Sequence, residues 1–184
     1  MNIKKISPQQ KEAEYRRLKT AQEYAHMTPY DQYPTRVQTN KNIKADLKKY
    51  FPDVNFSVKG TDGAVTIRWT DGPTYAMVHH LVQKFKFGHF DGSIDLYEYS
   101  NELFTDIYGG HQFVFCERYF SDEFIERAIQ KLTEKYSQLK ELHITAIGFQ
   151  CAHYWNVIFK EKNKSVHVLI SEILEEEDEV MRNE

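Results

Sequence analysis

The feature that most constrains the fold is a pair of alternating segments between residues 54 and 69. Apolar residues occupy every second position on both sides of the turn-forming stretch Gly60-Thr61-Asp62-Gly63. A period of two is typical of strands with one buried face, and the turn predicts that the two strands pair as a hairpin. The alternating apolar positions are Val54, Phe56, Val58, Val65, Ile67 and Trp69.

Helical patterns surround this hairpin, which predicts an α+β fold with a small antiparallel sheet and helices packed mainly on one face. The expected order is helix, helix, strand, strand, helix, strand, helix, followed by further strand or helix elements at the C-terminus. Ser7 and Gln10 form the capping box of a first helix that begins at Pro8. The second helix is expected at 41–51, and a third follows the breaker Thr70-Asp71-Gly72-Pro73.

Later in the chain, a third strand is expected from Phe113 to Phe120, and Ser121 is expected to cap a long helix. Residues 144–149 and 155–159 have strand-like patterns, and residues 166–174 fit either a strand followed by a helix or one amphipathic helix. We therefore predict an N-terminal helix and arm at 1–39, an α+β core domain at 40–142, and a C-terminal addition with an acidic tail at 143–184.

Composition favours an ordered intracellular protein. Hydrophobic residues make up 41% of the chain, and 12 Tyr and 12 Phe supply large side chains for a core. The only two cysteines, Cys116 and Cys151, do not form a CxxC motif, which argues against a secreted disulfide scaffold. The first residues lack the apolar run of a signal peptide, and no apolar stretch has the length of a membrane helix. The predicted location is the cytoplasm.

Charge is distributed unevenly along the chain. Residues 1–50 carry 11 Lys/Arg against 5 Asp/Glu, a net of +6, whereas residues 166–184 carry 1 Arg against 7 acids, a net of −6. A basic N-terminal third could bind nucleic acid or an acidic partner. The alternative is that both ends are solvated helices. The candidate nucleic-acid-binding residues are Lys44, Lys48, Lys49, Arg16 and Arg17.

Periodicity fails between Phe87 and Gly110, where acidic and aromatic residues alternate irregularly. Long segments of this kind in a globular domain are usually functional, and the many aromatic rings favour an ordered structure. One interpretation is a contact surface for a basic region of another protein, with rings as anchors and carboxylates that steer the encounter. The other is a structural cover over the core. The candidate contact residues are Phe90, Asp91, Asp95, Tyr97, Glu98, Tyr99 and Tyr108.

No catalytic or metal-binding motif emerges from the sequence. The eight histidines do not show HExxH or tight Cys/His spacing, and GxSxG, P-loop and GxGxxG motifs are absent. The segment Asp91-Gly92-Ser93-Ile94-Asp95 lacks the remaining ligands of a calcium loop. We expect a protein that is not an enzyme and has no cofactor or catalytic residue. Its oligomeric state is open, and the thin apolar face of the first helix leaves room for a dimer.

Between about residues 40 and 120 the chain resembles a known family, the twenty-ninth of the large polyvalent-protein-associated domains. The resemblance rests on the order and spacing of short motifs. These are Trp69-Thr70-Asp71-Gly72-Pro73-Thr74, then Val78, Val82 and Phe85, then Phe90-Asp91-Gly92, and then Asp95, Tyr97 and Tyr99.

The resemblance implies a protein of a phage, plasmid or integrated element, because such domains occur in large modular proteins that enter a new host with mobile DNA. It implies no catalytic residues. The leading hypothesis is a non-enzymatic accessory protein that binds a host macromolecule, such as a defence component, through the segment 87–110. Nucleic-acid binding by the basic N-terminal third is the alternative.

Overall fold

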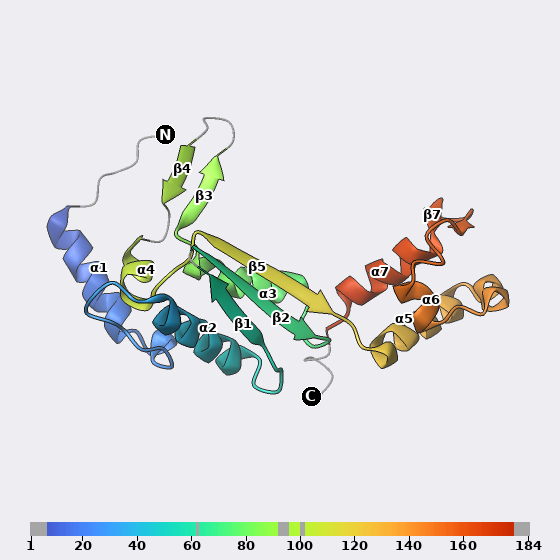
Figure 1. Cartoon of the computed structure of the whole chain (residues 1–184), viewed down its shortest axis with the longest axis horizontal. Coiled ribbons are helices and arrows are strands. Elements are labelled where there is room, and N and C mark those ends of the chain that lie inside the picture. The colour runs from blue at the N-terminus through green and yellow to red at the C-terminus, as the bar shows by residue number, and fades with distance from the viewer. Residues whose placement is uncertain (1–6, 62, 92–95, 100–101, 179–184) are drawn as a thin grey trace. The chain divides into compact units, whose positions relative to one another are not determined.

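The computed structural model describes residues 7–61, 63–91, 96–99 and 102–178 and confirms the α+β class (Figure 1). The helices are α1 (Pro8–Thr20), η1 (Gln22–Tyr24), α2 (Arg36–Tyr50), α3 (Tyr75–Val82), η2 (Gln83–Phe85), α4 (Glu102–Tyr108), α5 (Asp122–Lys135), η3 (Ser137–Leu142), α6 (Ala146–Gln150) and α7 (Val166–Glu176). The strands are β1 (Ser57–Thr61), β2 (Ala64–Thr70), β3 (Gly88–Asp91), β4 (Leu96–Tyr99), β5 (Phe113–Tyr119), β6 (Ile158–Phe159) and β7 (Lys164–Ser165).

The chain divides into two units. Unit 1 comprises the described residues within 1–68 and 76–117, and unit 2 comprises those within 69–75 and 118–184. These boundaries are not the predicted ones at 39/40 and 142/143. Residues 69–75, at the breaker that follows β2, belong to unit 2, and the chain then returns to unit 1 as far as residue 117. The long helix α5, expected to belong to the central domain, lies in unit 2.

A three-stranded sheet of order β1-β2-β5 forms the centre of unit 1. The predicted hairpin is confirmed, with β1 and β2 antiparallel and Lys59 opposite Thr66. The arrows of β2 and β5 point the same way in Figure 1, and the Phe113 amide donates to the Gly63 carbonyl at 2.9 Å. The sheet is therefore mixed, not purely antiparallel.

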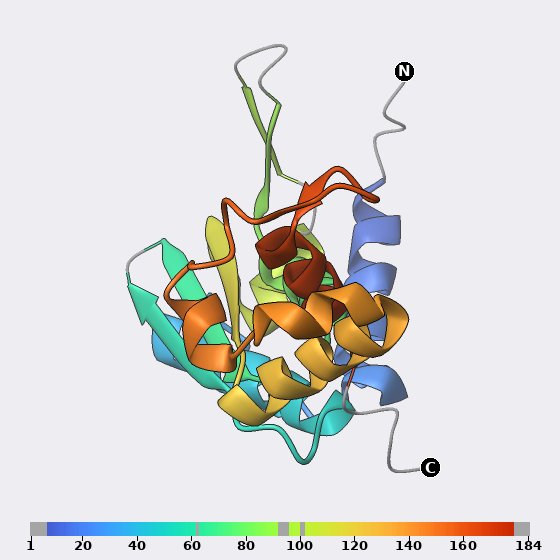
Figure 2. The ribbon, with the colours of Figure 1, turned by 90° about the vertical axis from the view of Figure 1, so that its right-hand side faces the viewer.

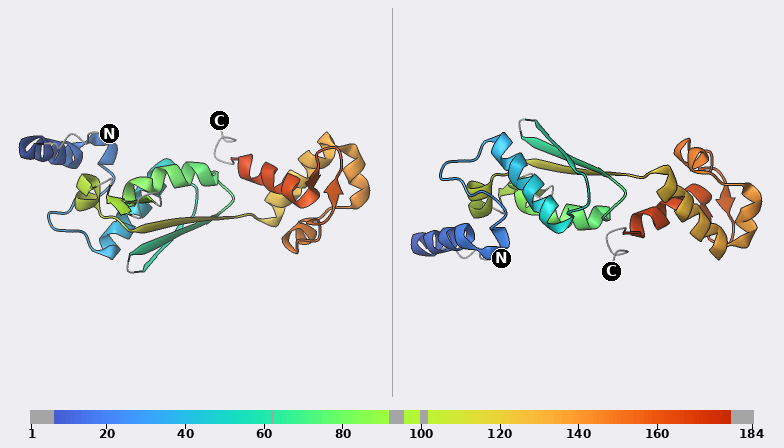
Figure 3. Two further views of the ribbon diagram at one scale, coloured as in Figure 1. Left: turned by 90° about the horizontal axis from the view of Figure 1, so that it is seen from above. Right: turned by 90° about the horizontal axis from the view of Figure 1, so that it is seen from below.

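Among the described residues of unit 1, helices cover one face of this sheet. Val58, Val65 and Ile67 are buried, and Figure 3 shows α2 and α3 on one side of the strands. The alternate positions are more exposed, as expected when side chains point to opposite faces along a strand. The described helices of unit 1 do not cover the other face, where Phe113 and Phe115 lie about half exposed (Figure 3).

Buried polar side chains join the N-terminal arm and α4 to α2. The Asn42 Nδ2 group donates to the carbonyls of Thr28 and Tyr108, both at 2.9 Å, and its Oδ1 accepts from the Thr28 amide at 2.8 Å. The Tyr108 hydroxyl donates to the Leu18 carbonyl at 2.9 Å. Each of these groups would be costly to bury alone, so the set specifies how the three segments fit together.

In unit 2, Arg118 connects two distant segments of the chain. Its guanidinium donates to the carbonyls of Asp71 and Gly72 and to those of Leu174 and Glu177 at the end of α7. The last carbonyls of a helix have no partner within the helix, so a cation that donates to them stabilises α7. The hydrophobic core of unit 2 lies around α5 and α7.

Several local expectations are confirmed by the structure. Ser7 and Gln10 form the capping box of α1, and Ser121 caps α5. The capping box that begins α2 is formed by Thr35 and Gln38, which places its start before the predicted residue 41. Asp71 adopts a positive φ of 57°, and its Oδ1 accepts from the Ser121 amide, so it supports the start of α5.

Two regions differ from the sequence prediction. The aperiodic segment 87–110 contains an antiparallel hairpin, β3 and β4, followed by α4. Residues 144–149, predicted as a strand, include α6, and of residues 155–159 only Ile158–Phe159 form a short strand. These elements are short, and periodicity over four or five residues does not distinguish a strand from a helix. Residues 166–174 lie in α7, which decides between the two alternatives in favour of one helix.

Replacing Gly109 with alanine should destabilise unit 1 by about 3 kcal/mol, because the strain of a left-handed backbone conformation adds to the clash of the new Cβ with Thr39. Gly109 has a φ of +88°, and a Cβ there would lie 2.0 Å from Thr39 Oγ1. Gly63→Ala is the matched control, since its φ is +85° but the nearest atom to its Cβ is 3.8 Å away. That variant should lose only about 1 kcal/mol. Urea unfolding of both variants measures the difference, and equal losses would contradict the close approach.

The stability of the protein should fall between pH 7 and pH 4 partly through His111. Burial lowers the pKa of His111 to about 4, with a further contribution from the Arg36 charge. Its Nε2–H donates to Asn40 Oδ1 at 3.0 Å. Below pH 6.5 the His111 imidazole is protonated in the unfolded chain, whereas in the folded chain it stays neutral down to about pH 4. The free energy of unfolding is therefore retained above pH 6.5 and falls as the pH drops towards 4.

His111→Gln keeps an amide donor and removes the titration. At pH 5 the wild type should lose about 2 kcal/mol relative to pH 8 in excess of the loss in this variant. Urea titrations at the two pH values measure the difference, and parallel pH profiles would show that His111 does not contribute.

Candidate functional site

The β3–β4 hairpin is the element that the predicted contact segment contributes to the surface. Figures 1 and 2 show it extending away from the sheet and helices of unit 1. Its register pairs Phe90 with Tyr97 and Gly88 with Tyr99, and it pairs His89 with Glu98. Residues directly opposite in an antiparallel pair share a face, and so do residues two apart along a strand.

The register therefore separates the candidate residues by chemistry. Positions 90, 97 and 99, all aromatic, lie on one face of the ribbon, and the titratable positions 89, 91 and 98 lie on the other together with Leu96. The sequence spacing alone could not sort them in this way, because the turn length was unknown. Asp95 was also a candidate and lies outside the described residues.

Tyr108 is placed differently from the other candidates. It lies at the end of α4, is 1% exposed, and packs against Phe104 with ring centroids 5.0 Å apart. Its hydroxyl donates a hydrogen bond to the Leu18 carbonyl within unit 1. The second half of the 87–110 segment thus covers the core, whereas the first half forms the hairpin. The structural-cover interpretation thus holds for the second half, and the contact-surface interpretation of the hairpin stays a prediction.

The basic candidates fall into two groups. Arg16 pairs with Glu12 and Arg17 with Glu14 along α1, at 2.9 and 2.7 Å. On α2, Lys48 and Lys49 donate to the backbone carbonyls of Pro52 and Glu23, respectively. Lys44 is also exposed on α2. Within the described part of the chain, no carboxylate pairs with these three lysines, so α2 keeps its positive charge.

A buried ion cluster that the sequence did not predict lies beside α2. Asp46 is fully buried, and its Oδ1 accepts from His26 Nε2 while its Oδ2 lies 2.7 Å from Lys84 Nζ. Lys84 Nζ also lies 5.6 Å from the centre of the Tyr24 ring. The three ionisable residues come from the segment between η1 and α2, from α2 and from η2, so their spacing in the sequence could not have predicted the cluster. Because the carboxylate is paired on both sides, the cluster is suited to holding these segments together.

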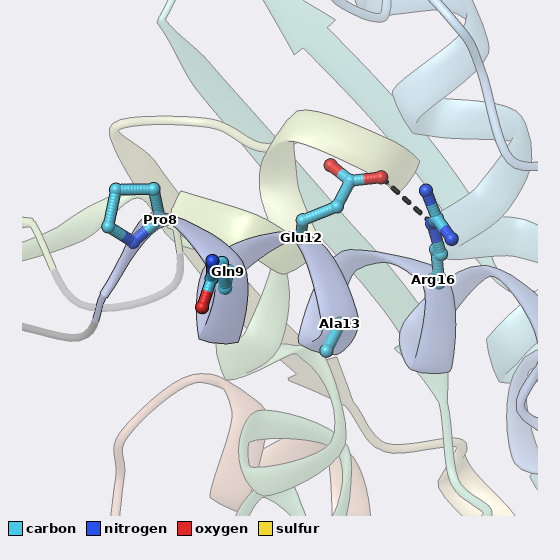
Figure 4. Close-up of a pocket in the computed structure, with 5 residues that line it drawn as sticks. All are labelled: Pro8, Gln9, Glu12, Ala13 and Arg16. Atoms are coloured by element: carbon cyan, nitrogen blue, oxygen red, sulfur yellow. Dashed lines mark hydrogen bonds and ion pairs between the residues drawn. The ribbon is translucent and has the colours of Figure 1, made fainter.

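The hollow shown in Figure 4 runs along the outer side of α1. Pro8, Gln9, Glu12, Ala13 and Arg16 line it, and all five are exposed. Its charged groups are the paired Glu12 and Arg16. A lining from one face of a single helix offers no convergent set of polar groups of the kind that small-molecule sites use.

The thiols occupy different environments. Cys116 on β5 is half-buried, and burial raises its pKa to about 11, so it remains a thiol at neutral pH. Cys151 is exposed at the end of α6, and His153 follows it in the adjoining turns. Across the described ranges, histidine, cysteine and carboxylate side chains do not gather in groups of three or more that could hold a metal ion. No helix among them has the length and apolar character needed to cross a membrane.

The open face of the sheet is a second surface that the sequence analysis missed. Phe113 and Phe115 are 45% and 52% exposed, and their rings are nearly parallel, at 11°, with centroids 6.2 Å apart. A sequence signal for this surface exists in β5, where apolar residues occupy consecutive positions from Phe113 to Cys116. Such a run places apolar side chains on both faces of the strand, so a sheet covered on one face leaves some of them exposed.

Comparison with known proteins tests the predicted resemblance. No curated protein and no solved structure is significantly similar to the chain. A family model, described as large polyvalent protein associated domain 29, matches residues 35–121. The match begins at the N-cap of α2 and ends at the N-cap of α5, so it includes the sheet and the hairpin. Residues 35–121 are thus similar to large polyvalent protein associated domain 29, which associates this protein with phages and other mobile genetic elements.

Proposed function

We propose that this protein is a non-enzymatic accessory protein of a mobile genetic element that binds a host protein through the aromatic face of the β3–β4 hairpin. The partner would be a component of host defence, met in the cytoplasm when the element enters the cell. The observation that carries the proposal is the hairpin itself, a projecting ribbon with three aromatic positions on one face. The family match supports the setting, since it associates the chain with mobile elements.

Physical considerations favour a binding role for such a ribbon. A two-stranded hairpin without a further layer is at best marginally stable in water, so it gains most from a partner that covers one face. Tyrosine and phenylalanine are among the residues that contribute most to protein interfaces. Carboxylates at positions 91 and 98 would increase the rate of encounter with a basic partner surface. The function therefore divides between the faces, with anchoring on one and steering on the other.

The double substitution Tyr97→Ala/Tyr99→Ala should weaken partner binding at least tenfold, because hot-spot aromatic residues typically contribute about 2 kcal/mol or more. The core of unit 1 should be unaffected, so the melting temperature should change little. The control is His89→Ala/Glu98→Ala, which alters the opposite face of the ribbon on β3 and β4. It should lower the affinity less, because it removes one steering carboxylate and no aromatic anchor. A photo-crosslinking amino acid at position 97, compared with one at 98, identifies the partner in host cells, and titration with the purified partner measures the affinity.

The two double variants distinguish anchoring from folding. Equal losses of affinity in both would mean that the hairpin acts through its fold and not through its aromatic face. A large drop in melting temperature with partner binding intact would assign these tyrosines a covering role and contradict the proposal.

Nucleic-acid binding by α2 remains the second candidate, and one observation favours it. The charges of Lys44, Lys48 and Lys49 are not neutralised by carboxylates within the described part of the chain, in contrast to Arg16 and Arg17. The proposal is thereby narrowed from the whole N-terminal third to one helix. A lysine that neutralises a phosphate releases counterions, which makes the affinity fall with salt.

The substitutions Lys44→Gln, Lys48→Gln and Lys49→Gln together should reduce the slope of log affinity against log salt by about two to three for duplex DNA. Arg16→Gln/Arg17→Gln serves as the control and should change it less, because those arginines are already paired. Fluorescence anisotropy between 50 and 200 mM salt is the measurement. An absence of salt-sensitive binding to duplex DNA by the wild type would remove this second candidate.

A further inference from the structure

We propose that the open face of the β1-β2-β5 sheet binds single-stranded nucleic acid, with Phe113 and Phe115 each stacking on one base. This surface uses neither the hairpin nor the lysines of α2, so the proposal does not depend on either function above. Its elements are the exposed faces of three strands within unit 1. The residues on this face are Ser57, Lys59 and Thr61 from β1, Ala64, Thr66 and Arg68 from β2, and Phe113, Phe115 and Glu117 from β5.

The two phenylalanine rings have the arrangement that stacking requires. They are two residues apart on one strand, where the rise along the chain is about 6.6 Å, and their centroids are 6.2 Å apart. The rings are nearly parallel, at 11°, and about half of each side chain is exposed. Unstacked bases are recognised in this way by aromatic side chains on sheets, because every base has a flat π-face.

The strand pairing arranges the remaining side chains in rows that cross the sheet. The bond from the Phe113 amide to the Gly63 carbonyl sets Phe115 beside Thr66 in parallel strands, and Thr66 pairs with Lys59 in the hairpin. Neighbouring strands are about 4.8 Å apart, so Lys59 lies about 10 Å from Phe115 across one row. A base on Phe115 would then have a hydroxyl beside it and a cation within reach of its phosphate.

The adjacent row carries the second cation of this face. Arg68 is bound by Glu117, with Nε 2.5 Å from Oε2, and the two residues lie side by side on β2 and β5. The pair is bidentate, since Nη2 also donates to Oε1 at 3.2 Å, and both side chains are 40% exposed. A phosphate can therefore approach Arg68 from solvent and would have to share it with Glu117 or displace it. Lys59 is exposed on β1, and among the nine positions of the face Glu117 is the one carboxylate.

The composition of the face favours nucleic acid over a protein partner or a second copy. Apart from the two rings, its side chains are hydroxyls, an alanine and charged groups, whereas the core of a protein interface is depleted of lysine and enriched in further apolar residues. Isolated rings among hydroxyls and cations suit bases that stack individually and donate or accept at their edges. The positive balance of the face, with Lys59 and Arg68 against Glu117, complements a phosphate backbone.

The test is a fluorescence anisotropy titration of the full-length protein with labelled twelve-nucleotide RNA and DNA of mixed sequence at 50 mM salt. The wild type should bind single strands at least tenfold more tightly than the corresponding duplex. Phe113→Ala/Phe115→Ala should lower the affinity at least tenfold and change the melting temperature only slightly, since about half of each side chain is already exposed. Phe115→Trp should retain binding, and its added tryptophan fluorescence should be quenched by the bound strand.

Matched variants separate this face from other surfaces. Tyr97→Ala/Tyr99→Ala should leave oligonucleotide binding intact, and Lys44→Gln/Lys48→Gln/Lys49→Gln should weaken it less than the loss of the two rings. The proposal would be overturned by an absence of single-strand binding, by equal affinity for duplex, or by binding that survives Phe113→Ala/Phe115→Ala. Light scattering that shows a dimer which this double variant converts to a monomer would instead assign the face to self-association.

Discussion

The hydrogen bonds of Asn42 are the interaction on which the architecture of unit 1 depends. This buried side chain on α2 uses its amide and its carbonyl oxygen on the backbone of Thr28 and on the end of α4 at Tyr108. Removing one partner would leave buried polar groups unpaired, which costs more than an average hydrogen bond contributes. The arm, α2 and α4 are therefore held in one arrangement. The Gly109 turn, which approaches Thr39 too closely for any side chain, follows directly from that arrangement.

The two surfaces proposed to bind partners, the open face of the sheet and the β3–β4 hairpin, follow from the way the helices of unit 1 pack on the sheet. Because α2 and α3 both lie on one face of the sheet, the other face has no helix of unit 1 over it among the described residues, and the phenylalanines of β5 stay about half exposed (Figure 3). The hairpin, by contrast, extends from the rest of unit 1 between η2 and α4 (Figure 1). A stable core thus supplies two separate surfaces of different chemistry. One presents aromatic positions backed by carboxylates, and the other presents rings among hydroxyls and cations.

Unit 2 is organised by a different device. Arg118 binds four backbone carbonyls, two in the turn after β2 and two at the end of α7. Guanidinium is well suited to this role because its donors lie in a rigid plane and it stays charged. The motif residues Asp71 and Gly72 thereby gain a structural explanation, since their carbonyls accept from Arg118 and the Asp71 carboxylate supports the start of α5.

The sequence by itself determined the elements whose signals are local. The hairpin around Gly60 to Gly63, the capping boxes and the caps at Ser7 and Ser121 follow from side chains and backbone groups within a few residues of one another. The resemblance to the polyvalent-protein-associated domain could also be identified from the sequence, because it rests on short motifs in a fixed order along the chain, and the family model matches residues 35–121. Only the tertiary structure decided which aromatic residues form a surface. Tyr108 and Tyr97 have similar sequence surroundings, yet one is buried by α1 and α2 while the other lies on a projecting strand. The pairing of Asp46 with His26 and Lys84, and the exposure of Phe113 and Phe115, likewise depend on which segments meet in space. Burial is a property of the completed packing, and no local pattern contains it.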